Sequence, residues 1–529
     1  MTARLPPAPG RAGAGAPAPP GARPLVRVHP RDDVAVAVVA LRAGDVVPLH
    51  AGGPAVTVRE DVPAGHKVAL RALAAGAPVH KYGHPIGRAS ADVAAGCWVH
   101  AHNLVTALRP ELPLAWSDRG PPPAPVDVPA GDAGRTFAGY RRPDGRVGTR
   151  NELWILPTVG CVNAAAARLA AVAGARLAGR VDGVHAFPHP YGCSQLGDDL
   201  ADTRRLLAAL VRHPNAGGVL LLGLGCENNQ AHALVAEVTR MGGVAPERLR
   251  VLATQEVADE HEAGLAALAA LADVAAHDRR TPCGLDALVV ALKCGGSDGL
   301  SGLTANPLVG RVAERLCAVG GIGVLSEVPE MFGAERVLFG RAADRATFDA
   351  AAAMASRFRA YFVAHGQPVH ENPSPGNHDG GITTLEEKSL GAVQKGGGAP
   401  VVQVCGYGVP LDPARRGGLA LVEAPGNDAV SSTAMTAAGA TLLLFTTGRG
   451  TPLGAPVPTL KIASNSALAA RKPTWIDCDA GRLVSAGESG EALADALLDQ
   501  LCATASGAPT CSERLGTREI ALWKRGVTL

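Results

Sequence analysis

The sequence of 529 residues lacks the features of a membrane protein and of a nucleic-acid-binding protein. No apolar run approaches the roughly 18 residues that a membrane-spanning helix needs, and the longest candidates are the strand-length pieces Val219–Leu222 and Thr441–Phe445. Fifty basic and 48 acidic side chains almost cancel, so the charge balance favours neither nucleic acid nor an anionic membrane surface as a partner. A small, metabolite-sized partner fits this composition better.

Cysteine is too sparse for a disulfide scaffold. Eleven cysteines, an odd number at irregular spacing, indicate free thiols in a reducing compartment, so we expect a cytoplasmic protein. Lysine is also rare beside alanine, glycine, proline and arginine, a bias typical of a GC-rich genome, and helix propensity read from composition therefore carries little weight. The remaining balance, with 47% apolar, 3% aromatic and 19% charged residues, is typical of a soluble globular protein of roughly two to four domains.

The first quarter of the chain divides into a tail, a small domain and a linker. Residues 1–24 have too few large apolar residues to bury a core and lack the hydrophobic stretch of a secretory signal, so a disordered tail is predicted. Residues 109–136, with the run Pro121-Pro122-Pro123, predict an interdomain linker. Between them, residues 25–108 predict a small all-β domain from short turn-punctuated runs at Leu25–His29, Val34–Ala40, Ala55–Val58, Lys67–Leu70 and Trp98–Ala101.

After the linker, apolar strand-like runs alternate with Ala/Leu-rich helical stretches about every thirty residues, which is typical of βαβ units and a parallel sheet. We divide this α/β region into a second domain, residues 137–280, and a C-terminal catalytic domain, residues 281–529. Ligands of parallel sheets bind outside the carboxyl ends of the strands. The loops that follow the strands are therefore where chemistry is expected. The runs begin near Glu152, Val184, Gly218, Leu249 and Asp286, and the helical stretches are Ala164–Leu177, Asp202–Arg212, Gln230–Met241 and His261–Ala272.

A cysteine beside glycine ends four of these runs. Since side chains at equivalent strand ends of one sheet point into a shared crevice, the four thiols are predicted to form the ligand pool of a soft or borderline metal such as iron. The alternative is that each cysteine is a small apolar residue suited to a tight, glycine-flanked turn. The four candidates are Cys161, Cys193, Cys226 and Cys294.

The glycine-rich loop over residues 294–307 follows a strand and precedes a predicted helix over Leu308–Val319. Its backbone N–H groups favour an anion such as a carboxylate, and Gly295, Gly296 and Ser297 are the candidates for holding it. The loop matches neither the Walker nor the Rossmann pattern, so no nucleotide is implied. A merely tight turn is the alternative.

Other polar residues also suit a sugar acid. Asn377 belongs to a loop dense in hydrogen-bonding groups that suits a polyol. Arg449 and Lys461 are candidate carboxylate ligands, since an arginine fork binds a carboxylate bidentately and a lysine supplies a point charge. In the β domain, His29 and His66 are candidate acid/base or metal-binding groups. The alternatives are a solvated loop, surface cations and structural histidines.

Long strings that contain these residues resemble the altronate/galactarate dehydratase family. The resemblance covers nearly everything after residue 25, but not the tail or His378-Asp379. Strings of this length are highly specific. They include GHKVAL (65–70), VGTRNELWILPTVGCVN (147–163), YGCSQLGDD (191–199), GLGCENNQ (223–230), CGGSDGLSGLTANP (294–307), SEVPEMFGAE (326–335), NPSPGN (372–377) and TTGRGTP (446–452).

The resemblance implies an N-terminal β-clip domain of the SAF type, a two-part α/β catalytic region, and a hydro-lyase that requires Fe²⁺ or another divalent cation such as Mn²⁺. It implies that D-altronate loses water to give 2-dehydro-3-deoxy-D-gluconate in galacturonate breakdown. Such a reaction needs a cation on the carboxylate and 2-hydroxyl, a base for the C2 proton and an acid for the leaving 3-hydroxyl. We assign the proton transfers to His29 and His66.

Three other functions stay open. Galactarate or a related acid is an alternative substrate, because one loop can change specificity without changing the scaffold. A desulfonating enzyme for sulfolactate is disfavoured, because its β-clip domain is usually a separate chain. A non-catalytic carbohydrate-binding protein is disfavoured by the density of Cys, Asp, Ser, His and Arg in the strand-end loops. The sequence leaves the oligomeric state open, a homo-oligomer included.

Overall fold

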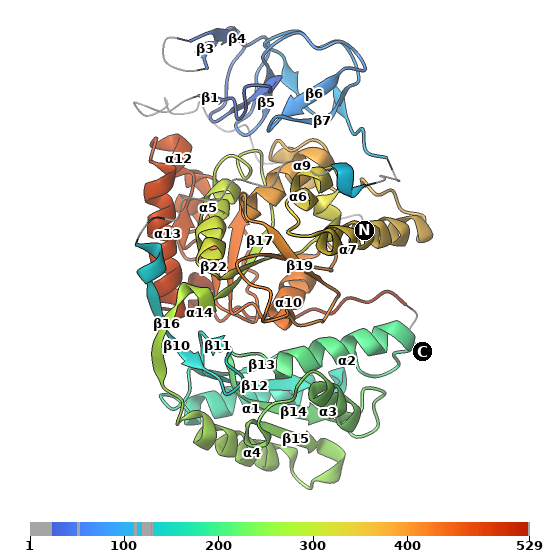
Figure 1. The fold of residues 1–529 in the computed structure, drawn as a ribbon, viewed down its shortest axis with the longest axis vertical. Coiled ribbons are helices and arrows are strands. Elements are labelled where there is room, and N and C mark those ends of the chain that lie inside the picture. The colour runs from blue at the N-terminus through green and yellow to red at the C-terminus, as the bar shows by residue number, and fades with distance from the viewer. Residues whose placement is uncertain (1–23, 50–52, 110–113, 119–128, 130, 527–529) are drawn as a thin grey trace, which may run out of the picture.

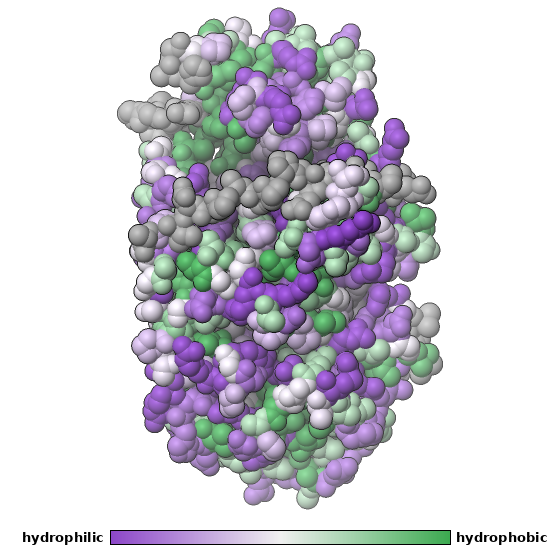
Figure 2. Space-filling view, viewed as in Figure 1, coloured by the Kyte–Doolittle hydropathy of each residue, from purple (hydrophilic) through white to green (hydrophobic). Residues whose placement is uncertain are grey.

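The computed structural model describes residues 24–49, 53–109, 114–118, 129 and 131–526. Along its longest axis the β domain lies at one end, the C-terminal domain in the middle and the second domain at the other end (Figure 1). The predicted tail up to residue 23 and most prolines of the predicted linker lie outside the described residues. None of the helices within the described ranges is long and apolar enough to cross a membrane. Hydrophilic and hydrophobic residues are interspersed over the face shown in Figure 2.

The β domain forms from short antiparallel strands, as its turn-punctuated pattern predicts. One sheet has the order β1-β2-β5-β8, and its strands are β1 (Leu25–Val26), β2 (Val34–Ala37), β5 (Lys67–Ala69) and β8 (Trp98–Val99). A second sheet was not predicted. The predicted run Ala55–Val58 forms one strand of a hairpin whose other strand was not predicted, because these unpredicted runs are brief and mixed with polar residues. These elements are β6 (Pro78–Lys81), β7 (His84–Ala89) and β9 (Leu104–Val105), and the hairpin β3 (Val46–Pro48) with β4 (Ala55–Thr57).

The second domain is a parallel sheet between two helical layers, which confirms the predicted alternation. Its strands pair in the order β13-β12-β14-β15. Successive residues of β12 and β14 are buried on opposite faces, so both strands read as continuous apolar runs. Helices α1 and α4 cover one face, and α2 and α3 the other. The elements are β12 (Glu152–Pro157), β13 (Gly183–Ala186), β14 (Ala216–Gly223), β15 (Leu249–Ala253), α1 (Asn163–Arg176), α2 (Gly197–Val211), α3 (Ala231–Arg240) and α4 (Glu260–Ala275).

A small antiparallel ribbon joins the second domain to the rest of the chain. Strand β10 (Thr136–Arg141) enters the domain, and β16 (Arg280–Gly284) leaves it; the two pair along their length, with β11 (Val147–Gly148) on the other edge of β10. The ribbon packs on the C-terminal domain, where Ser506 Oγ accepts a hydrogen bond from Ala138 N at 3.0 Å. The two chain segments that connect the second domain to the rest of the protein are therefore paired with each other and packed on the C-terminal domain.

The C-terminal domain is built on a seven-stranded parallel sheet in the order β19-β20-β18-β17-β21-β22-β23. The chain leaves β17 towards β18 on one side and returns through β21 on the other, so the carboxyl end of β17 is a switch point of the kind where ligands bind. Its strands are β17 (Val289–Cys294), β18 (Ile322–Leu325), β19 (Val401–Cys405), β20 (Gly418–Val422), β21 (Leu442–Thr447), β22 (Thr459–Ala463) and β23 (Cys478–Asp479). Its helices are α5 (Ala305–Ala318), α6 (Glu335–Phe339), α7 (Arg345–Ala364), α8 (Pro375–Asp379), α9 (Leu385–Ala392), α10 (Asp428–Ala438), α11 (Ser466–Arg471), α12 (Arg482–Ser485), α13 (Gly490–Ala505) and α14 (Cys511–Arg514).

His213 joins the second and C-terminal domains as a neutral ring. It stacks on Trp154 with ring centroids 4.9 Å apart. Its Nε2 donates to Ala440 O at 3.0 Å, and its Nδ1 accepts from Asn215 N at 3.1 Å. Both ring nitrogens are used by the neutral tautomer, and burial lowers the pKa of His213 to about 3.

We expect the free energy of unfolding to decrease on acidification through His213. The unfolded histidine binds a proton below about pH 6.5, whereas the folded ring does not until about pH 3. The stabilisation is therefore complete above pH 6.5 and is lost as pH falls towards 3, with a loss of about 2 kcal/mol by pH 5. Urea unfolding at pH 7.5 and 5.0 should show a smaller pH difference for His213→Gln than for the wild type. The exposed His277→Gln serves as the control, and an unchanged difference in His213→Gln would contradict this account.

Candidate active site

A cavity of about 700 Å³ opens at the carboxyl end of β17. Its wall is formed by the loop after β17, the turn after β18, the segment that leads into and includes α8, one residue of α9, and the loop before α10 together with its first residue. Its position at the switch point of the sheet agrees with the general location of ligands in parallel α/β domains. The lining residues are Cys294, Gly295, Gly296, Glu330, Glu371, Asn372, Pro373, Ser374, Pro375, Asn377, His378, Lys388, Gly426 and Asp428.

Two residues that line this cavity, Cys294 and Glu330, form a buried cluster of one thiol and two carboxylates with Glu327. Ligand atoms of Cys294, Glu327 and Glu330 lie within 4.8 Å of one another, and all three residues are buried. The Cys294 thiol donates to Glu330 Oε2 at 3.4 Å. Glu327 has a left-handed backbone with φ of 64°, a costly conformation for a residue other than glycine and one concentrated at functional sites. One sulfur and two carboxylate groups are a donor set that suits a borderline divalent cation such as Fe²⁺.

Three lysines neutralise this acidic cluster. Lys293 pairs with Glu327 and, at 2.6 Å, with Asp428. Lys388 pairs with Glu330 at 2.9 Å, and Lys395 Nζ lies 2.8 Å from the sulfur of Cys294. The lysine charges balance the carboxylates, so a bound cation and an anionic substrate would together add little net charge.

The surroundings of the acidic groups shift their pKa values in different directions. Burial raises the pKa of Glu327, and the charge of Glu330 raises it further. Burial alone would raise the pKa of Glu330, but the ammonium groups, Lys388 foremost, outweigh it and hold that pKa below its usual range. Burial raises the pKa of Cys294 to about 11, so without a cation this residue is a thiol.

The loop around α8 carries the remaining polar groups of the cavity. Asn377 Nδ2 donates to Ser297 O at 2.9 Å, and its Oδ1 accepts from Lys388 at 3.1 Å. Asn377 thereby ties the loop after β17 to the loop that carries His378. His378 Nδ1 donates to Ile382 O at 3.0 Å, which leaves Nε2 of the neutral ring as an acceptor. His378 is the one histidine among the residues that line the cavity.

The predicted substrate-binding residues lie at different distances from this cavity. Gly295, Gly296 and Asn377 line it, and Ser297 is the buried residue whose carbonyl Asn377 binds. Arg449 is exposed, and its guanidinium lies beside Gly376 of the α8 loop. Lys461 is buried behind the lining, where it donates to the carbonyl of Thr451 at 2.7 Å. Burial lowers the pKa of Lys461 to about 8.

The predicted acid/base histidines do not line the cavity. His66 lies at the interface of the β domain with the α8 loop, where its Nε2 is 3.3 Å from Asp379 O and its Nδ1 accepts from Trp98 at 3.2 Å. The ring of His100 packs against both His66 and His378, with centroid distances of 4.8 Å to His66 and 6.2 Å to His378. His29 lies against Gly83 within the β domain.

The four predicted cysteine ligands divide between two sheets. Cys161, Cys193 and Cys226 follow β12, β13 and β14 of the second domain and are exposed, whereas Cys294 ends β17 of the C-terminal domain and is buried. The expectation of one shared crevice is therefore wrong. Its physical reason is that β16 carries the chain out of the second domain, so the run at residues 289–294 starts a new sheet.

The β domain is held over the α8 loop by a buried group of three charges. Lys67 and Lys81 of the β domain each lie 2.8 Å from a different oxygen of Glu387 on α9. Lys67 also donates to Gly381 O at 2.7 Å. In Figure 1, α9 lies directly beneath β7. The β domain therefore positions the segment that carries His378 without lining the cavity itself.

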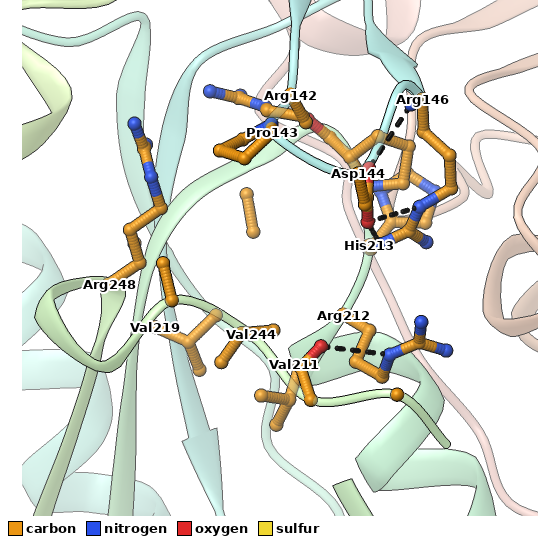
Figure 3. A pocket seen from close by; sticks show the side chains of 16 residues that line it. Arg142, Pro143, Asp144, Arg146, Val211, Arg212, His213, Val219, Val244 and Arg248 are labelled. Carbon is orange, nitrogen blue, oxygen red and sulfur yellow. Dashed lines mark hydrogen bonds and ion pairs between the residues drawn. The ribbon is translucent and has the colours of Figure 1, made fainter. Parts of the chain in front are cut away.

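A second cavity, of about 180 Å³, lies in the second domain beside α2. Two of its arginines are used in structural ion pairs, since Arg142 and Arg248 each lie 2.7 Å from Asp278. Figure 3 shows these two guanidinium groups pointing away from the space, which is bordered by apolar side chains such as Val219 and Val244. This cavity lacks a convergent polar set, so the cavity at β17 is the candidate active site.

Comparison with known proteins covers almost the whole chain. Family models match at residues 23–107 (Altronate/galactarate dehydratase SAF domain), 139–276 (D-galactarate dehydratase/Altronate hydrolase, second domain) and 285–528 (D-galactarate/Altronate dehydratase, C-terminal). The chain is 50% identical to an altronate dehydratase of Escherichia coli (strain K12), over 95% of this chain and 99% of that protein. It is 44% identical to an altronate dehydratase of Bacillus subtilis (strain 168), over 96% and 99%. Identity is 32% to a galactarate dehydratase (L-threo-forming) of E. coli K12, over 91% and 92%.

Proposed function

Since the chain belongs to the altronate/galactarate dehydratase family, we propose that it is a hydro-lyase that converts D-altronate to 2-dehydro-3-deoxy-D-gluconate and water. The altronate dehydratases are nearer to this chain than the galactarate dehydratase, which favours altronate as the substrate. One structural observation carries the proposal. The cavity at β17 combines a buried thiol and carboxylates with lysines and glycine-rich backbone, a set that suits an α-hydroxy acid.

The proposal includes a divalent cation held by Cys294, Glu327 and Glu330, with Fe²⁺ as the first choice and Mn²⁺ as the alternative. When bound, the cation supplies a Lewis acid for the carboxylate and 2-hydroxyl of the substrate. Our proposal also includes a cytoplasmic location, supported by the fact that all eleven cysteines are unpaired.

The residues of the cavity suit the proton transfers of such a reaction. Removing the C2 proton places a second negative charge beside the carboxylate, and the ammonium groups of Lys293, Lys388 and Lys395 lower the energy of that state. We assign the C2 proton to His378 Nε2, because Ile382 O holds the opposite ring nitrogen as a donor. The imidazolium then returns this proton to the departing 3-hydroxyl, which leaves as water, and the enol tautomerises to the 2-keto acid.

Substitution of His378 tests this assignment. His378→Asn is expected to lower kcat by roughly 10²- to 10⁴-fold, the usual contribution of a general base. His365→Asn, an exposed histidine at the end of α7, is the control and should leave turnover unchanged. If His29→Asn or His66→Asn abolishes turnover while His378→Asn does not, the assignment from sequence is the correct one.

The function itself is tested by an anaerobic assay. The protein is loaded with Fe²⁺ and supplied separately with D-altronate, galactarate and D-mannonate, and the 2-keto-3-deoxy acid is measured before and after chelation. We expect turnover of altronate that is lost with the chelator and restored by iron. Turnover of galactarate instead would reassign the substrate, and binding of altronate without product would favour the non-catalytic alternative.

A further inference from the structure

Three of the eleven cysteines are exposed. All eleven lie within the described residues; Cys161, Cys193 and Cys226 are exposed, and the other eight are buried or half-buried. Free cysteine is among the residue types most often found buried. The three thiols that reach solvent are also the three that follow neighbouring strands of the second domain's sheet. One shared role would explain both why these three thiols are exposed and why they follow neighbouring strands.

The three cysteine loops meet over the end of β12, the middle strand of the three. Strands β13 and β14 flank β12, at the spacing of about 4.8 Å that is usual between hydrogen-bonded strands. Gly160 N donates to Tyr191 O at 2.9 Å, which joins the loops after β12 and β13. Asn229 N donates to Gly192 O at 2.9 Å, which joins the loops after β13 and β14. Because the loops are hydrogen-bonded to one another, the three cysteines lie at one edge of the sheet. Their sulfur atoms do not all lie within 4.8 Å of one another, unlike the ligand atoms of the cluster at Cys294.

The backbone around these thiols is held in conformations that present them. Gly192 and Gly225, which precede two of the cysteines, have φ values of 103° and 130°. A Cβ atom on Gly192 would lie 2.0 Å from Thr158 O, so glycine is required for the loops to approach. Ser194, which follows Cys193, has φ of 56° although it is not glycine, a conformation concentrated at functional sites.

Polar side chains contact two of the three sulfur atoms. Gln255 Nε2 donates to Cys226 Sγ at 3.7 Å, and Ser194 Oγ lies 3.9 Å from Cys193 Sγ. Donors of this kind stabilise thiolates and tune metal centres that thiolates hold. The neighbouring carboxylate of Glu227 is already engaged by the backbone amides of Gly225, at 2.6 Å, and Leu224, at 3.2 Å. Sulfur is therefore the ligand that this edge offers.

We propose that Cys161, Cys193 and Cys226 bind an iron–sulfur cluster, whose thiolate ligands stand farther apart than those of a single ion, at a site separate from the cavity of the C-terminal domain. On binding, each thiol releases its proton to solvent and supplies one thiolate. Held by three thiolates, a four-iron cluster would keep one iron without a protein ligand. The carboxylate-rich set in the cavity suits a harder cation, so the two sites differ in metal preference.

The experiment uses the full chain, incubated anaerobically with Fe²⁺ alone in one arm and with Fe³⁺, excess thiol as reductant and sulfide in the other, then desalted. Iron, acid-labile sulfide, visible absorption and Mössbauer spectra are measured. We expect a thiolate-to-iron absorption in the wild type that the triple variant Cys161→Ser/Cys193→Ser/Cys226→Ser loses, with at least roughly tenfold less iron at this site. Sulfide bound together with iron supports the cluster, and iron held by these thiols without sulfide would contradict it.

Two control variants distinguish loss of iron at these three thiols from loss of the proposed dehydratase activity. Cys97→Ser removes a half-buried thiol of the β domain and should leave the absorption unchanged. Glu330→Gln alters the cavity and should also keep it, whether or not turnover survives. Circular dichroism verifies that the triple variant is folded. The proposal is overturned if the folded triple variant retains the absorption, or if the wild type gains none in either arm.

Discussion

Replacing Glu387 by glutamine is expected to lower the free energy of unfolding by about 3–5 kcal/mol, the cost of removing one partner from a buried ion pair. The carboxylate accepts from Lys67 and Lys81 at 2.8 Å each, and from Thr383 N and Oγ1 at 2.8 Å each. Glutamine has nearly the same shape but carries no charge. It would leave two fully buried ammonium groups without a counter-ion at the interface between the β domain and α9.

The charge of Glu387 also gives the effect a pH signature. Burial alone would raise the pKa of Glu387, but the two lysines outweigh burial and hold the pKa well below its usual range. Since this carboxyl is more acidic in the folded than in the unfolded protein, its stabilisation is present above about pH 4.3 and is lost as pH falls below it. Glu387→Gln should remove this part of the acid sensitivity.

Urea unfolding and limited proteolysis measure the two consequences of Glu387→Gln. The unfolding midpoint should decrease, and cleavage between the β domain and the rest of the chain should become faster because the interface is weakened. The matched control is Asp349→Asn on α7, which removes an exposed pair with Arg345 and should change stability by less than about 0.5 kcal/mol. Equal stability of Glu387→Gln and the wild type would show that the three charges contribute nothing net.

Sequence periodicity predicted the parts of the fold in which local pattern and tertiary structure agree. The helix expected over Ala164–Leu177 is α1, and the apolar run that begins near Gly218 is β14. Periodicity does not reveal which strands share a sheet. The runs after residues 151 and 285 look alike, yet β12 and β17 belong to different sheets. For this reason the four cysteines were predicted to share one crevice, whereas the fold places Cys294 on a different sheet from the other three.

The acidic cluster was missed because its members are brought together only by the tertiary fold. Glu327 and Glu330 lie in a turn after β18, a strand that the sequence analysis did not single out. One signal was present in the composition. The chain contains eight lysines among 50 basic residues, and five of the eight are buried: Lys67, Lys81, Lys293, Lys395 and Lys461. In a sequence that uses arginine almost everywhere, a lysine inside an apolar run marks a buried ammonium group with a specific partner.

Glu330→Gln is the substitution for which we expect the largest loss of function. Glu330 lines the cavity, and its two oxygens contact the Cys294 thiol at 3.4 Å and Lys388 at 2.9 Å. The amide keeps the volume but removes an anionic ligand from the set of one thiol and two carboxylates. We expect affinity for a divalent cation to fall by at least roughly 100-fold, and kcat/KM for altronate by at least roughly 10³-fold, because charge developing in the transition state then loses its compensation.

Mn²⁺ is the probe that reports on this site alone, because Mn²⁺ prefers oxygen ligands to thiolates. The free ion is followed by electron paramagnetic resonance during titration of the full chain. Glu371→Gln is the matched control, since Glu371 borders the same cavity but lies outside the cluster of ligand atoms; it should bind Mn²⁺ within about threefold of the wild type. If Glu330→Gln binds Mn²⁺ as the wild type does and turnover is still lost, Glu330 acts on the substrate directly. If both binding and turnover survive, the cluster at Cys294 is not the metal centre, and the thiols of the second domain become the sole ligand set to examine.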